Sequence, residues 1–585
     1  MAPKLSVSPV TTALNAPAHA PATVLSEVYT SKPLSDVAAE HRNLSALQRA
    51  RLQYNPRYNP VLADPAAVVL QQGQPTTAAF DQDHIAKLFP NLYGQPSLSF
   101  AKHVPSHFEP KTVGVVLSGG PAPGGHNVIC GMFDFVSNLN PNSKLLGFRN
   151  GPDGLLNAEY VLLDADTVAL YRNQGGFHMI GSGRTKIETP AQFDAVRNTV
   201  EQLDLDALVI VGGDDSNSNA MKIAEHFKQH QLKCCVNGAP KTIDNDLRNA
   251  QVQVSFGFDT AAKSYAESIA SLAFDAVSAR KAYHFVRVMG RSASHIALEC
   301  ALQTHPNLCF IGEEVKHNST TLLDVVRTVV DLIQQRSLQG KNYGVIVLPE
   351  GLVEFMPDVE ALIAELNEIL AHAERSLSRQ QITEKLNPRN AELFRNLPDA
   401  IANQLMLERD PHGNVQVAKI EAERLLIGMV SSRLAMLKKE GLYKGKFSGV
   451  PHYLGYEARC AMPSNFDANY TYGLGRVAAA LCCNGKTGYI ATLSNLTKPA
   501  EEWVPAGFPL TMMMNIERRH GKDSAVIKKM LVDLQGAPFT DFALKRESWK
   551  LNDEYRSPGT TQFWGPTADV VSMSLQLEAS VTANQ

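Results

Sequence analysis

The chain has 585 residues, of which 44% are hydrophobic, so it can bury at least one large core and does not fall in the disordered class. Its 55 lysines and arginines nearly balance 58 aspartates and glutamates, and a formal charge of -3 argues against a broad nucleic-acid binder. No apolar run reaches about 18 residues and no apolar segment follows a basic start, so we expect no membrane span, no secretory signal and a cytoplasmic location. Eight cysteines without a C-x-x-C pair favour a reduced interior.

The first 85 residues differ from the rest of the chain. They are rich in Ala, Pro, Ser and Thr with little periodicity, which predicts a flexible N-terminal extension. No arginine precedes Arg42, whereas organelle transit peptides are rich in arginine, so the composition disfavours a targeting role.

Short β-branched runs alternate with helical patterns from residue 113 onward, which is typical of a parallel sheet wrapped by helices. Five such runs are predicted strands, at 113–117, 207–211, 233–236, 283–288 and 343–348. Each ends in a loop of glycine and polar residues. Because open α/β sheets bind ligands at the carboxyl ends of their strands, we expect these loops to line one crevice.

The loop at 118–127 contains four glycines where a strand turns into a helix, including Gly119. Glycines let backbone N–H groups approach an anion closely, which suggests phosphate binding. Such turns are also common structural devices, so this loop alone leaves both interpretations open. It matches neither the dinucleotide fingerprint nor a Walker A loop.

Two adjacent carboxylates, Asp214 and Asp215, follow the second strand and precede a helix. Helix capping would account for one of them readily and for both less well. The alternative is a Mg²⁺ site, because Mg²⁺ prefers a few oxygen ligands beside substrate phosphates.

The loop after the third strand adds Lys241, Thr242, Asp244 and Asp246. A turn with Asp and Asn would be ordinary by itself. Together with the carboxylates of the second loop it predicts an acidic centre among phosphate-binding loops, which is the arrangement of metal-assisted phosphoryl transfer. Arg291, after the fourth strand, either pairs with a carboxylate or stabilises the charge of a transferring phosphoryl group.

The pattern changes to a period of 3.6 residues between 356 and about 445, which predicts a helical insertion. The segment 451–497 returns to α/β character. The segment 521–585 is predicted to be a C-terminal extension that ends in a loose tail from residue 574.

Read in order, these loops resemble the phosphofructokinase family, most closely its long pyrophosphate-dependent form of the catalytic beta-subunit type. The resemblance runs from about residue 86 to 566. Its most specific stretches are GVVLSGGPAPGGHNVI, YRNQGGFHMIGSGRTKIETP, IVGGDDSNSNA, PKTIDNDL, HFVRVMGRSASHIALECALQTHPN and LGYEARC.

The resemblance implies an α/β fold of two Rossmann-like three-layer domains with parallel-rich sheets. Residues 86–255, with a return near 480–520, would bind pyrophosphate and Mg²⁺. Residues 256–480, which include the helical insertion, would bind fructose 6-phosphate. The implied reaction is reversible phosphoryl transfer from pyrophosphate to the 1-hydroxyl of fructose 6-phosphate, a step of glycolysis and gluconeogenesis that gives fructose 1,6-bisphosphate and phosphate.

The resemblance also implies roles for single residues. Asp244 would take the proton of the sugar hydroxyl, with a pKa near the reference value of about 4. Asp214 would hold Mg²⁺, and the pyrophosphate would contact Gly119, Arg184 and Lys241. The sugar phosphate would contact Thr242, Asp246, Met289, Gly290, Arg291, Glu350, Tyr456 and Arg459. Lys281 would reach a neighbouring subunit, which implies a homo-oligomer or a hetero-oligomer with a regulatory alpha-type subunit.

Two positions predict the phosphoryl donor. Relatives that use a nucleotide carry Gly where this chain has Asp215 and Lys241. A carboxylate about 4 Å from a nucleotide α-phosphate would cost roughly 4 kcal/mol at an effective dielectric near 20. The chain is therefore predicted to use pyrophosphate and to reject ATP, with Lys241 neutralising the phosphates.

Two residues depart from the family pattern, since Asn245 and Ala282 stand where Gly and an aromatic residue are frequent. Ala282 weakens the cross-subunit expectation for Lys281. The alternative functions are an ATP-dependent 6-phosphofructokinase, a non-catalytic regulatory subunit, and a generic anion-binding α/β module.

Overall fold

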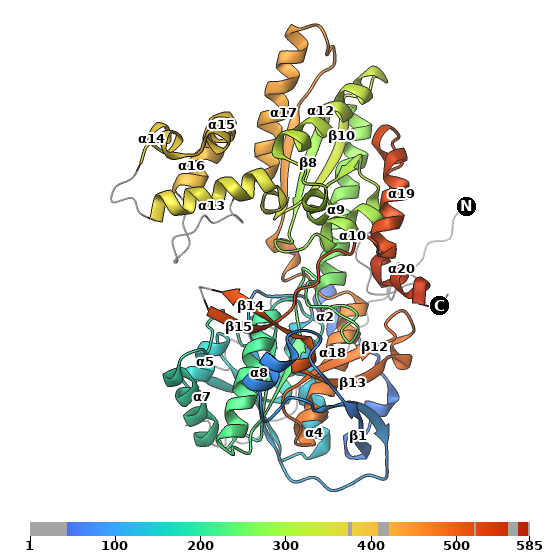
Figure 1. Cartoon of the computed structure of the whole chain (residues 1–585). Coiled ribbons are helices and arrows are strands. Elements are labelled where there is room, and N and C mark those ends of the chain that lie inside the picture. The colour runs from blue at the N-terminus through green and yellow to red at the C-terminus, as the bar shows by residue number, and fades with distance from the viewer. Residues whose placement is uncertain (1–43, 372–376, 408–419, 520–521, 560–570, 583–585) are drawn as a thin grey trace, which may run out of the picture.

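The computed structural model describes residues 44–371, 377–407, 420–519, 522–559 and 571–582 of the chain. These residues form two α/β lobes, each built on its own sheet (Figure 1). A two-stranded hairpin, β14 (Met514–Arg519) with β15 (Lys522–Ile527), lies near their junction. In the part of the chain that the structure describes, no helix is both long and apolar enough to cross a membrane.

The first lobe holds a nine-stranded sheet whose five central neighbours, β12, β7, β6, β3 and β4, run parallel, with antiparallel strands at both edges. Its strands are β1 (Val68–Pro75), β2 (Pro96–Lys102), β3 (Thr112–Leu117), β4 (Lys144–Phe148), β5 (Tyr160–Leu163), β6 (Ala207–Gly212), β7 (Cys235–Pro240), β12 (Tyr489–Ser494) and β13 (Val504–Pro509). The central strands are buried on both faces, which explains why they read as continuous apolar runs.

Helices cover both faces of this sheet, as the alternation of side chains along a strand requires. Val115 packs toward one core, with α4 (Gly125–Leu139) and α18 (Asn465–Cys483). Val116 packs toward another core, with α7 (Pro190–Gln202) and α8 (Asp214–Gln229). The lobe therefore has the three layers expected from the sequence.

The second lobe holds a parallel four-stranded sheet in the order β11 (Gly449–Leu454), β8 (Ala282–Val288), β10 (Tyr343–Pro349) and β9 (Leu308–Cys309). One face packs on α9 (Phe258–Ala279) and α10 (His295–Thr304), and the other on α12 (Leu322–Leu338) and α17 (Ala422–Lys439). All five strands predicted from the sequence are present, as three in the first sheet and two in the second.

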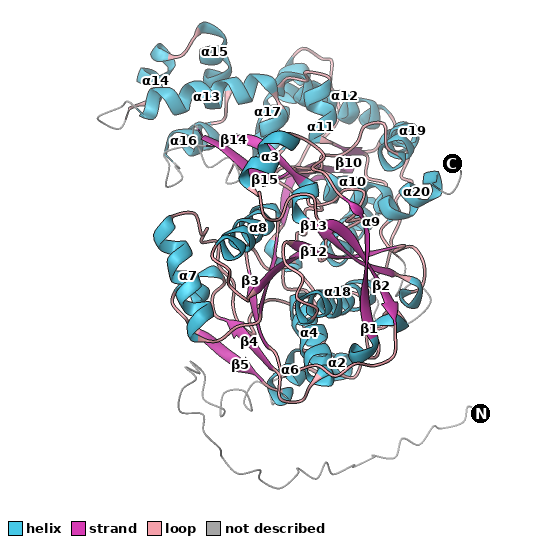
Figure 2. Ribbon diagram, turned by 60° about the horizontal axis from the view of Figure 1, so that its bottom comes forward, coloured by secondary structure: helices cyan, strands magenta, loops and turns pink. Residues whose placement is uncertain are grey.

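The predicted helical insertion is confirmed. It comprises α13 (Pro357–Ala371), α14 (Arg379–Lys385), α15 (Pro388–Asn396), α16 (Asp399–Leu407) and α17. Leu366 and Phe394 are fully buried in the apolar core that also covers the second sheet. Helices α13 to α16 stand together at one side of the second lobe (Figure 2).

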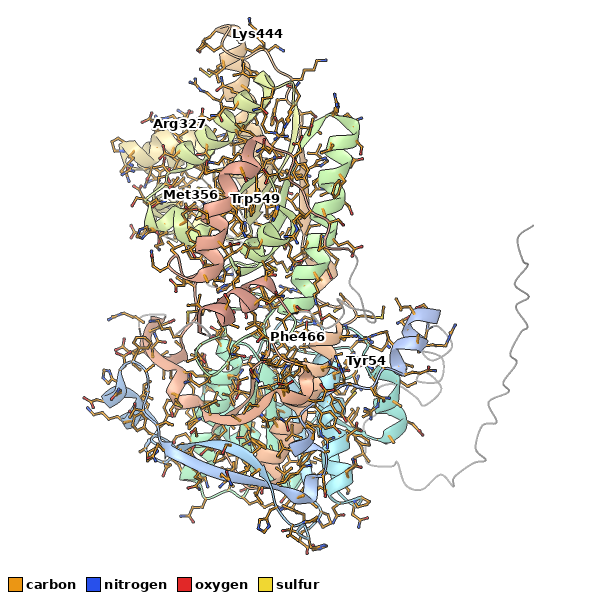
Figure 3. The ribbon with its side chains drawn as sticks, turned by 90° about the vertical axis from the view of Figure 1, so that its right-hand side faces the viewer. Tyr54, Arg327, Met356, Lys444, Phe466 and Trp549 are labelled. Carbon is orange, nitrogen blue, oxygen red and sulfur yellow. The ribbon has the colours of Figure 1, made fainter. Side chains whose placement is uncertain are left out.

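The structure differs from the expected N-terminal extension of residues 1–85. Residues 1–43 lie outside the described part, but α2 (Ala46–Leu52) and β1 belong to the first lobe. Buried Arg51 donates to Asn465 Oδ1 at 2.8 Å and to the Pro463 carbonyl at 3.0 Å. The Tyr54 hydroxyl donates to Asn469 Oδ1 in α18 at 2.9 Å, so this segment meets the same helix (Figure 3). Contacts between residues so far apart in the sequence produce no local periodicity, so the sequence pattern did not reveal that this segment is ordered.

Two C-terminal expectations are also corrected. Helix α18 lies within the expected second domain at 256–480 but packs against α4 of the first lobe. A Cβ at Gly475 would come within 2.1 Å of the Val128 carbonyl oxygen, so the two backbones touch. The tail from residue 574 contains most of α20 (Met573–Thr582), because the buried Glu299 carboxylate accepts the Met573 and Ser574 backbone N–H groups.

Candidate active site

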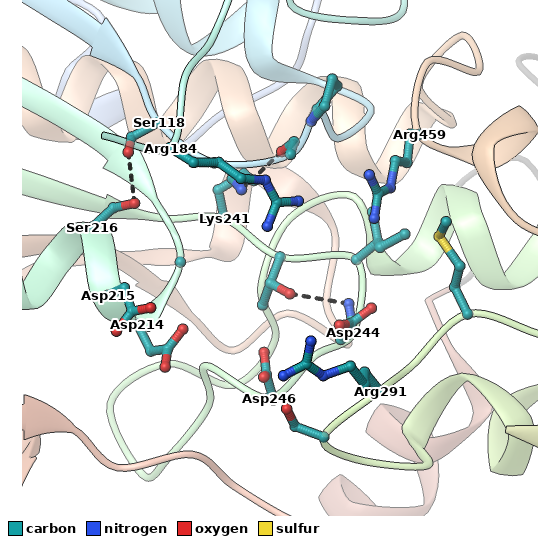
Figure 4. A pocket seen from close by; sticks show the side chains of 18 of the residues that line it. Ser118, Arg184, Asp214, Asp215, Ser216, Lys241, Asp244, Asp246, Arg291 and Arg459 are labelled. Carbon is teal, nitrogen blue, oxygen red and sulfur yellow. Dashed lines mark hydrogen bonds between the residues drawn. The ribbon is translucent and has the colours of Figure 1, made fainter. Parts of the chain in front are cut away.

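A cavity of about 570 Å³ lies between the lobes, at the carboxyl ends of strands from both sheets (Figure 4). The loops after β3, β6, β7, β8 and β10 all contribute to its wall, which confirms that they line one crevice. Two serines join the first two loops, since Ser216 Oγ donates to Ser118 Oγ at 2.8 Å. The predicted residues that line the cavity are Gly119, Arg184, Asp214, Asp215, Lys241, Thr242, Asp244, Asp246, Met289, Arg291, Glu350, Tyr456 and Arg459.

Gly290 and Lys281 are the predicted residues that do not line the cavity. Gly290 has a φ of 118°, and a Cβ there would lie 2.8 Å from the Ala293 carbonyl oxygen, so this glycine shapes the turn after β8. Lys281 is exposed at the opposite end of β8, about 20 Å away at roughly 3.3 Å per residue. Its cross-subunit role stays a prediction.

Lys241 joins the glycine loop to the loop after β7. Its ammonium donates to the Gly120 carbonyl at 2.9 Å and would lie 3.0 Å from a Cβ on Gly119. Burial lowers the pKa of Lys241 most, and the positive charges of Arg184 and Arg459 lower it as well. Together they bring it from 10.5 to about 8. A pKa of about 8 leaves the side chain mostly protonated at pH 7. The resulting cluster of three cations suits a phosphate with several negative charges.

Asp214 and Asp215 begin α8, but neither is its capping residue. Gly213 holds the N-cap position, and no side chain caps the helix there. Asp214 is largely buried, and its Oδ2 has no hydrogen-bond partner among the described residues. Burial raises the pKa of this carboxyl group. Asp215 is 45% exposed and pairs with Lys186 at 3.3 Å. Capping therefore does not account for the two carboxylates.

Asp244 is partly buried in the cavity wall, and its backbone N–H donates to Thr242 Oγ1 at 3.1 Å. Burial first, and then the carboxylates of Asp246 and Glu350, raises the pKa of Asp244 to about 7. The expected pKa near 4 is therefore wrong, because it assumed a solvated side chain. A carboxylate with a pKa near the working pH is well matched to proton transfer.

Asn245 adopts a φ of 56° between the two loop carboxylates. Asparagine tolerates this left-handed conformation better than most residues, so it can stand where relatives carry glycine. Its side-chain oxygen accepts the Ser255 backbone N–H at 3.1 Å. This bond adds a restraint on the loop that glycine cannot provide.

The wall formed by the second lobe carries side chains for a polar, anionic ligand. Burial raises the pKa of Glu350, which accepts a long hydrogen bond from Tyr453 at 3.4 Å. The Arg459 guanidinium lies 4.9 Å from the centre of the Tyr456 ring. Arg291 pairs with Glu354 at 3.7 Å and is 61% exposed, so it both meets a carboxylate and borders the cavity.

Sequence reasoning missed Lys529, which comes from the segment after β15. Its ammonium lies 3.8 Å from Asp214 Oδ2 and 3.6 Å from Asp246 Oδ2. Burial lowers the pKa of Lys529, but Asp214 and the neighbouring carboxylates outweigh this effect and raise it overall. The residue follows no predicted strand and sits in no glycine loop, so no sequence signal marked it.

The acidic residues suit Mg²⁺ better than a metal that needs a complete protein cage. Within the described residues, no group of three or more His, Cys, Asp and Glu side chains is arranged to hold a metal ion. Mg²⁺ usually takes one or two carboxylates and completes its shell with water and substrate phosphates. The carboxylates of Asp214 and Asp246, which both lie within 4 Å of the Lys529 ammonium, provide such oxygen ligands.

Comparisons with known proteins agree with this geometry. Residues 112–388 match the family model described as phosphofructokinase. The chain is 50% identical over 583 residues to the beta 1 subunit of pyrophosphate–fructose 6-phosphate 1-phosphotransferase from Arabidopsis thaliana, covering 99% of both chains. It is 38% identical over 553 residues to the alpha subunit of that enzyme from Solanum tuberosum, covering 92% of this chain and 89% of the relative.

A solved structure is also similar. The crystal structure of a pyrophosphate-dependent phosphofructokinase from Marinobacter aquaeolei matches with a TM-score of 0.51 and 17% identity. The match covers 79% of this chain and 97% of that one. At this identity the likeness concerns the fold, and it agrees with the expected two-domain α/β architecture.

Proposed function

Since the chain belongs to the phosphofructokinase family, we propose that it transfers a phosphoryl group reversibly from pyrophosphate to the 1-hydroxyl of fructose 6-phosphate. The products are fructose 1,6-bisphosphate and phosphate. The observation that carries the choice of donor is that Asp215 and Lys241, where nucleotide-using relatives have glycine, both line the cavity.

The surroundings of Asp215 determine how strongly this carboxylate disfavours ATP relative to pyrophosphate. A carboxylate about 4 Å from a nucleotide α-phosphate costs about 4 kcal/mol at an effective dielectric of 20 and about 1 kcal/mol in water. Asp215 is 45% exposed and pairs with Lys186, so the cost lies toward the lower value. The preference for pyrophosphate therefore also depends on Lys241, which strengthens the binding of a donor that has no adenosine to bury.

Each lobe has a proposed ligand. The first lobe binds pyrophosphate through Gly119, Arg184 and Lys241, and the second binds fructose 6-phosphate through the loops after β8, β10 and β11. Met289, Arg291, Glu350, Tyr456 and Arg459 from those loops line the cavity and support this assignment. Thr242 and Asp246 complete the acceptor loop, and Gly290 keeps its turn in shape.

Asp244 is the proposed general base, which takes the proton of the sugar 1-hydroxyl as the phosphoryl group arrives. The loose transition state asks little activation of the hydroxyl, so positioning by the Thr242 and Asp246 loop contributes most. Asp214 would hold Mg²⁺, which would neutralise charge on the donor phosphates when bound. Arg291 and Lys241 hold the transferring group from opposite lobes.

A non-catalytic regulatory subunit is the second candidate, and the cavity disfavours it. Asp214, Asp215, Asp244 and Asp246 all line the wall, so the metal and base positions are intact. The identity of 50% to a beta subunit against 38% to an alpha subunit points the same way.

The wider setting follows from the proposed reaction. The enzyme would act in glycolysis and gluconeogenesis in the cytoplasm. It would assemble as a homo-oligomer or with an alpha-type subunit, which the alpha and beta names of two relatives support. Exposed Lys281 is the residue proposed to reach a neighbouring sugar site.

A paired donor assay tests the proposal. The purified chain is supplied with Mg²⁺ and fructose 6-phosphate together with either pyrophosphate or ATP, and fructose 1,6-bisphosphate is measured. We expect turnover with pyrophosphate and none with ATP. The double variant Asp215→Gly with Lys241→Gly should lose pyrophosphate activity and relax the rejection of ATP. Turnover of the unaltered chain with ATP alone would end the donor assignment.

A further inference from the structure

Lys529 stands at the meeting point of two acidic loops. Its ammonium lies within 4 Å of Asp214 Oδ2 and of Asp246 Oδ2, at 3.8 and 3.6 Å, and donates to Ser292 Oγ at 3.0 Å. Asp214 comes from the start of α8, Asp246 from the loop after β7 and Ser292 from the loop after β8. One cation therefore touches the proposed metal ligand, the acceptor loop and the second lobe.

The backbone on both sides of Lys529 is fixed to the site. The Ile527 N–H donates to Ser218 Oγ in α8 at 2.8 Å, and the Met530 N–H donates to the Asp246 carbonyl at 2.8 Å. These bonds hold the backbone around Lys529 beside the cavity that its side chain lines. Four rotatable methylenes let an ammonium exchange one oxygen partner for another nearby without any change in the backbone.

The contacts of the Lys529 ammonium leave one of its carboxylate partners without a hydrogen bond. Asp214 Oδ2 is buried and accepts no hydrogen bond from the part of the chain that the structure describes. At 3.8 Å the Lys529 ammonium neutralises the carboxylate but is too far away to hydrogen-bond to this oxygen. The Lys529 side chain is 34% exposed and lines the cavity, so the ammonium faces the donor space as well as the carboxylates. A metal could therefore bind Asp214, and a phosphate in the cavity could bind the Lys529 ammonium.

We propose that Lys529 is a substrate-binding residue with two successive partners. In the free protein its ammonium neutralises Asp214 and Asp246. When Asp214 is engaged by the metal, the ammonium turns to a phosphate oxygen of the donor and adds a cation to those of Lys241 and Arg184. The inference rests on the proposed function and names a donor-binding residue from the C-terminal segment.

This assignment predicts two effects of opposite sign when the charge is removed. A cation that competes for Asp214 weakens metal binding to the free protein, so its loss strengthens that binding. A cation that binds the donor strengthens pyrophosphate binding, so its loss weakens it. A residue that only holds the fold together would weaken both.

The experiment compares the unaltered chain with Lys529→Met, which keeps the length of the side chain and removes its charge. Mn²⁺ binding to the protein without substrates is measured by electron paramagnetic resonance. Pyrophosphate binding is measured by calorimetry at a fixed excess of Mg²⁺ without fructose 6-phosphate. We expect Mn²⁺ to bind more tightly and pyrophosphate to bind about 10 to 100 times more weakly, as for a lost hydrogen bond to a charged group.

Two further variants make the result specific. Lys529→Arg keeps the charge and should restore pyrophosphate binding to within a few fold. Lys528→Met is the matched control, because the exposed Lys528 ammonium lies 3.7 Å over the Phe80 ring and not in the cavity. We expect it to change neither affinity. If Lys529→Met melts at a much lower temperature, Lys529→Gln replaces it in the same titrations.

The proposal is overturned if Lys529→Met binds Mn²⁺ no more tightly than the unaltered chain, or if it binds pyrophosphate equally well. These failures differ from failure of the proposed function. If the unaltered chain turns over pyrophosphate and Lys529→Met binds it normally, only the role of Lys529 is lost. If the unaltered chain does not use pyrophosphate, the donor assignment itself is wrong.

Discussion

The ammonium of Lys241 donates to the carbonyl oxygen of Gly120 at 2.9 Å from a position that is 5% exposed. This bond ties the glycine loop after β3 to the acidic loop after β7, so the donor and acceptor sides of the cavity share a buried cation. The geometry also explains the missing side chain of Gly119, where a Cβ would lie 3.0 Å from the same ammonium. The proton on Lys241 should therefore control donor binding.

We predict an alkaline limit to activity that is set by Lys241. Its pKa is lowered from 10.5 to about 8, so above pH 8 the folded protein loses this cation. The kcat/KM for pyrophosphate should fall about tenfold per pH unit beyond that point, as expected for loss of one required proton. Lys241→Arg keeps its charge at this pH, so this limit should move upward in the variant. An unchanged profile in Lys241→Arg would contradict the assignment.

The same pKa shift predicts the opposite trend for stability. Between pH about 8 and 10.5 the unfolded chain carries a proton on Lys241 that the folded protein lacks. The contribution of this group to the free energy of unfolding therefore rises with pH across that window. Urea unfolding of the unaltered chain and of Lys241→Met at pH 7.5 and pH 9.5 measures it, and the variant should lack this contribution.

Gly119→Ala should harm both the fold and donor binding. Its φ of 85° disfavours any side chain by about 1 to 2 kcal/mol, and the new methyl group would push on the Lys241 ammonium. Gly441→Ala is the matched control, because Gly441 has a φ of 75° and nothing within 4 Å of a Cβ. Both variants should lose similar stability, but only Gly119→Ala should raise the KM for pyrophosphate. Equal KM values would separate Gly119 from the donor.

Asp244→Asn should remove most turnover and leave the fold intact. A general base typically contributes a factor of about 10² to 10⁴, so kcat should fall in this range while the KM for fructose 6-phosphate changes little. The folded protein raises the pKa of this carboxyl group from 3.8 to about 7, so ionising it costs stability at neutral pH. The amide has no such cost, and the melting temperature should not fall. Near-normal kcat would refute the role as base.

The predictable part of the site came from local patterns. Gly119, Asp214 and Asp244 each follow a buried strand, and strand ends meet at one edge of a sheet whatever the remaining contacts are. The sequence could not indicate Lys529, because its position depends on the segment after β15, which runs from α8 to Glu313 of the second lobe. It also could not give the pKa of Asp244, which depends on burial beneath residues from both lobes.

The fold shows the same division between local and distant causes. The five predicted strands are apolar runs, and the insertion has a helical period, so both could be read from the sequence. The place of α18 depends on Gly475 touching the backbone of α4 at Val128, and the N-terminal lobe contacts depend on Arg51 meeting Asn465. Such pairings join residues more than 300 positions apart and have no signature in either segment.

The contact between α4 and α18 yields the last prediction. A methyl group on Gly475 would lie 2.1 Å from the Val128 carbonyl oxygen, and this neighbour is backbone that no rotamer change can move. Gly475→Ala should therefore cost about 3 kcal/mol, since separating the helices opens the core of the first lobe. Gly428→Ala in α17 is the control, because its nearest neighbour is a Pro398 side chain at 3.3 Å and alanine favours the helix by about 1 kcal/mol. Thermal unfolding should show a clear loss for Gly475→Ala and little change or a small gain for Gly428→Ala; equal melting temperatures would mean that α4 and α18 do not pack this closely.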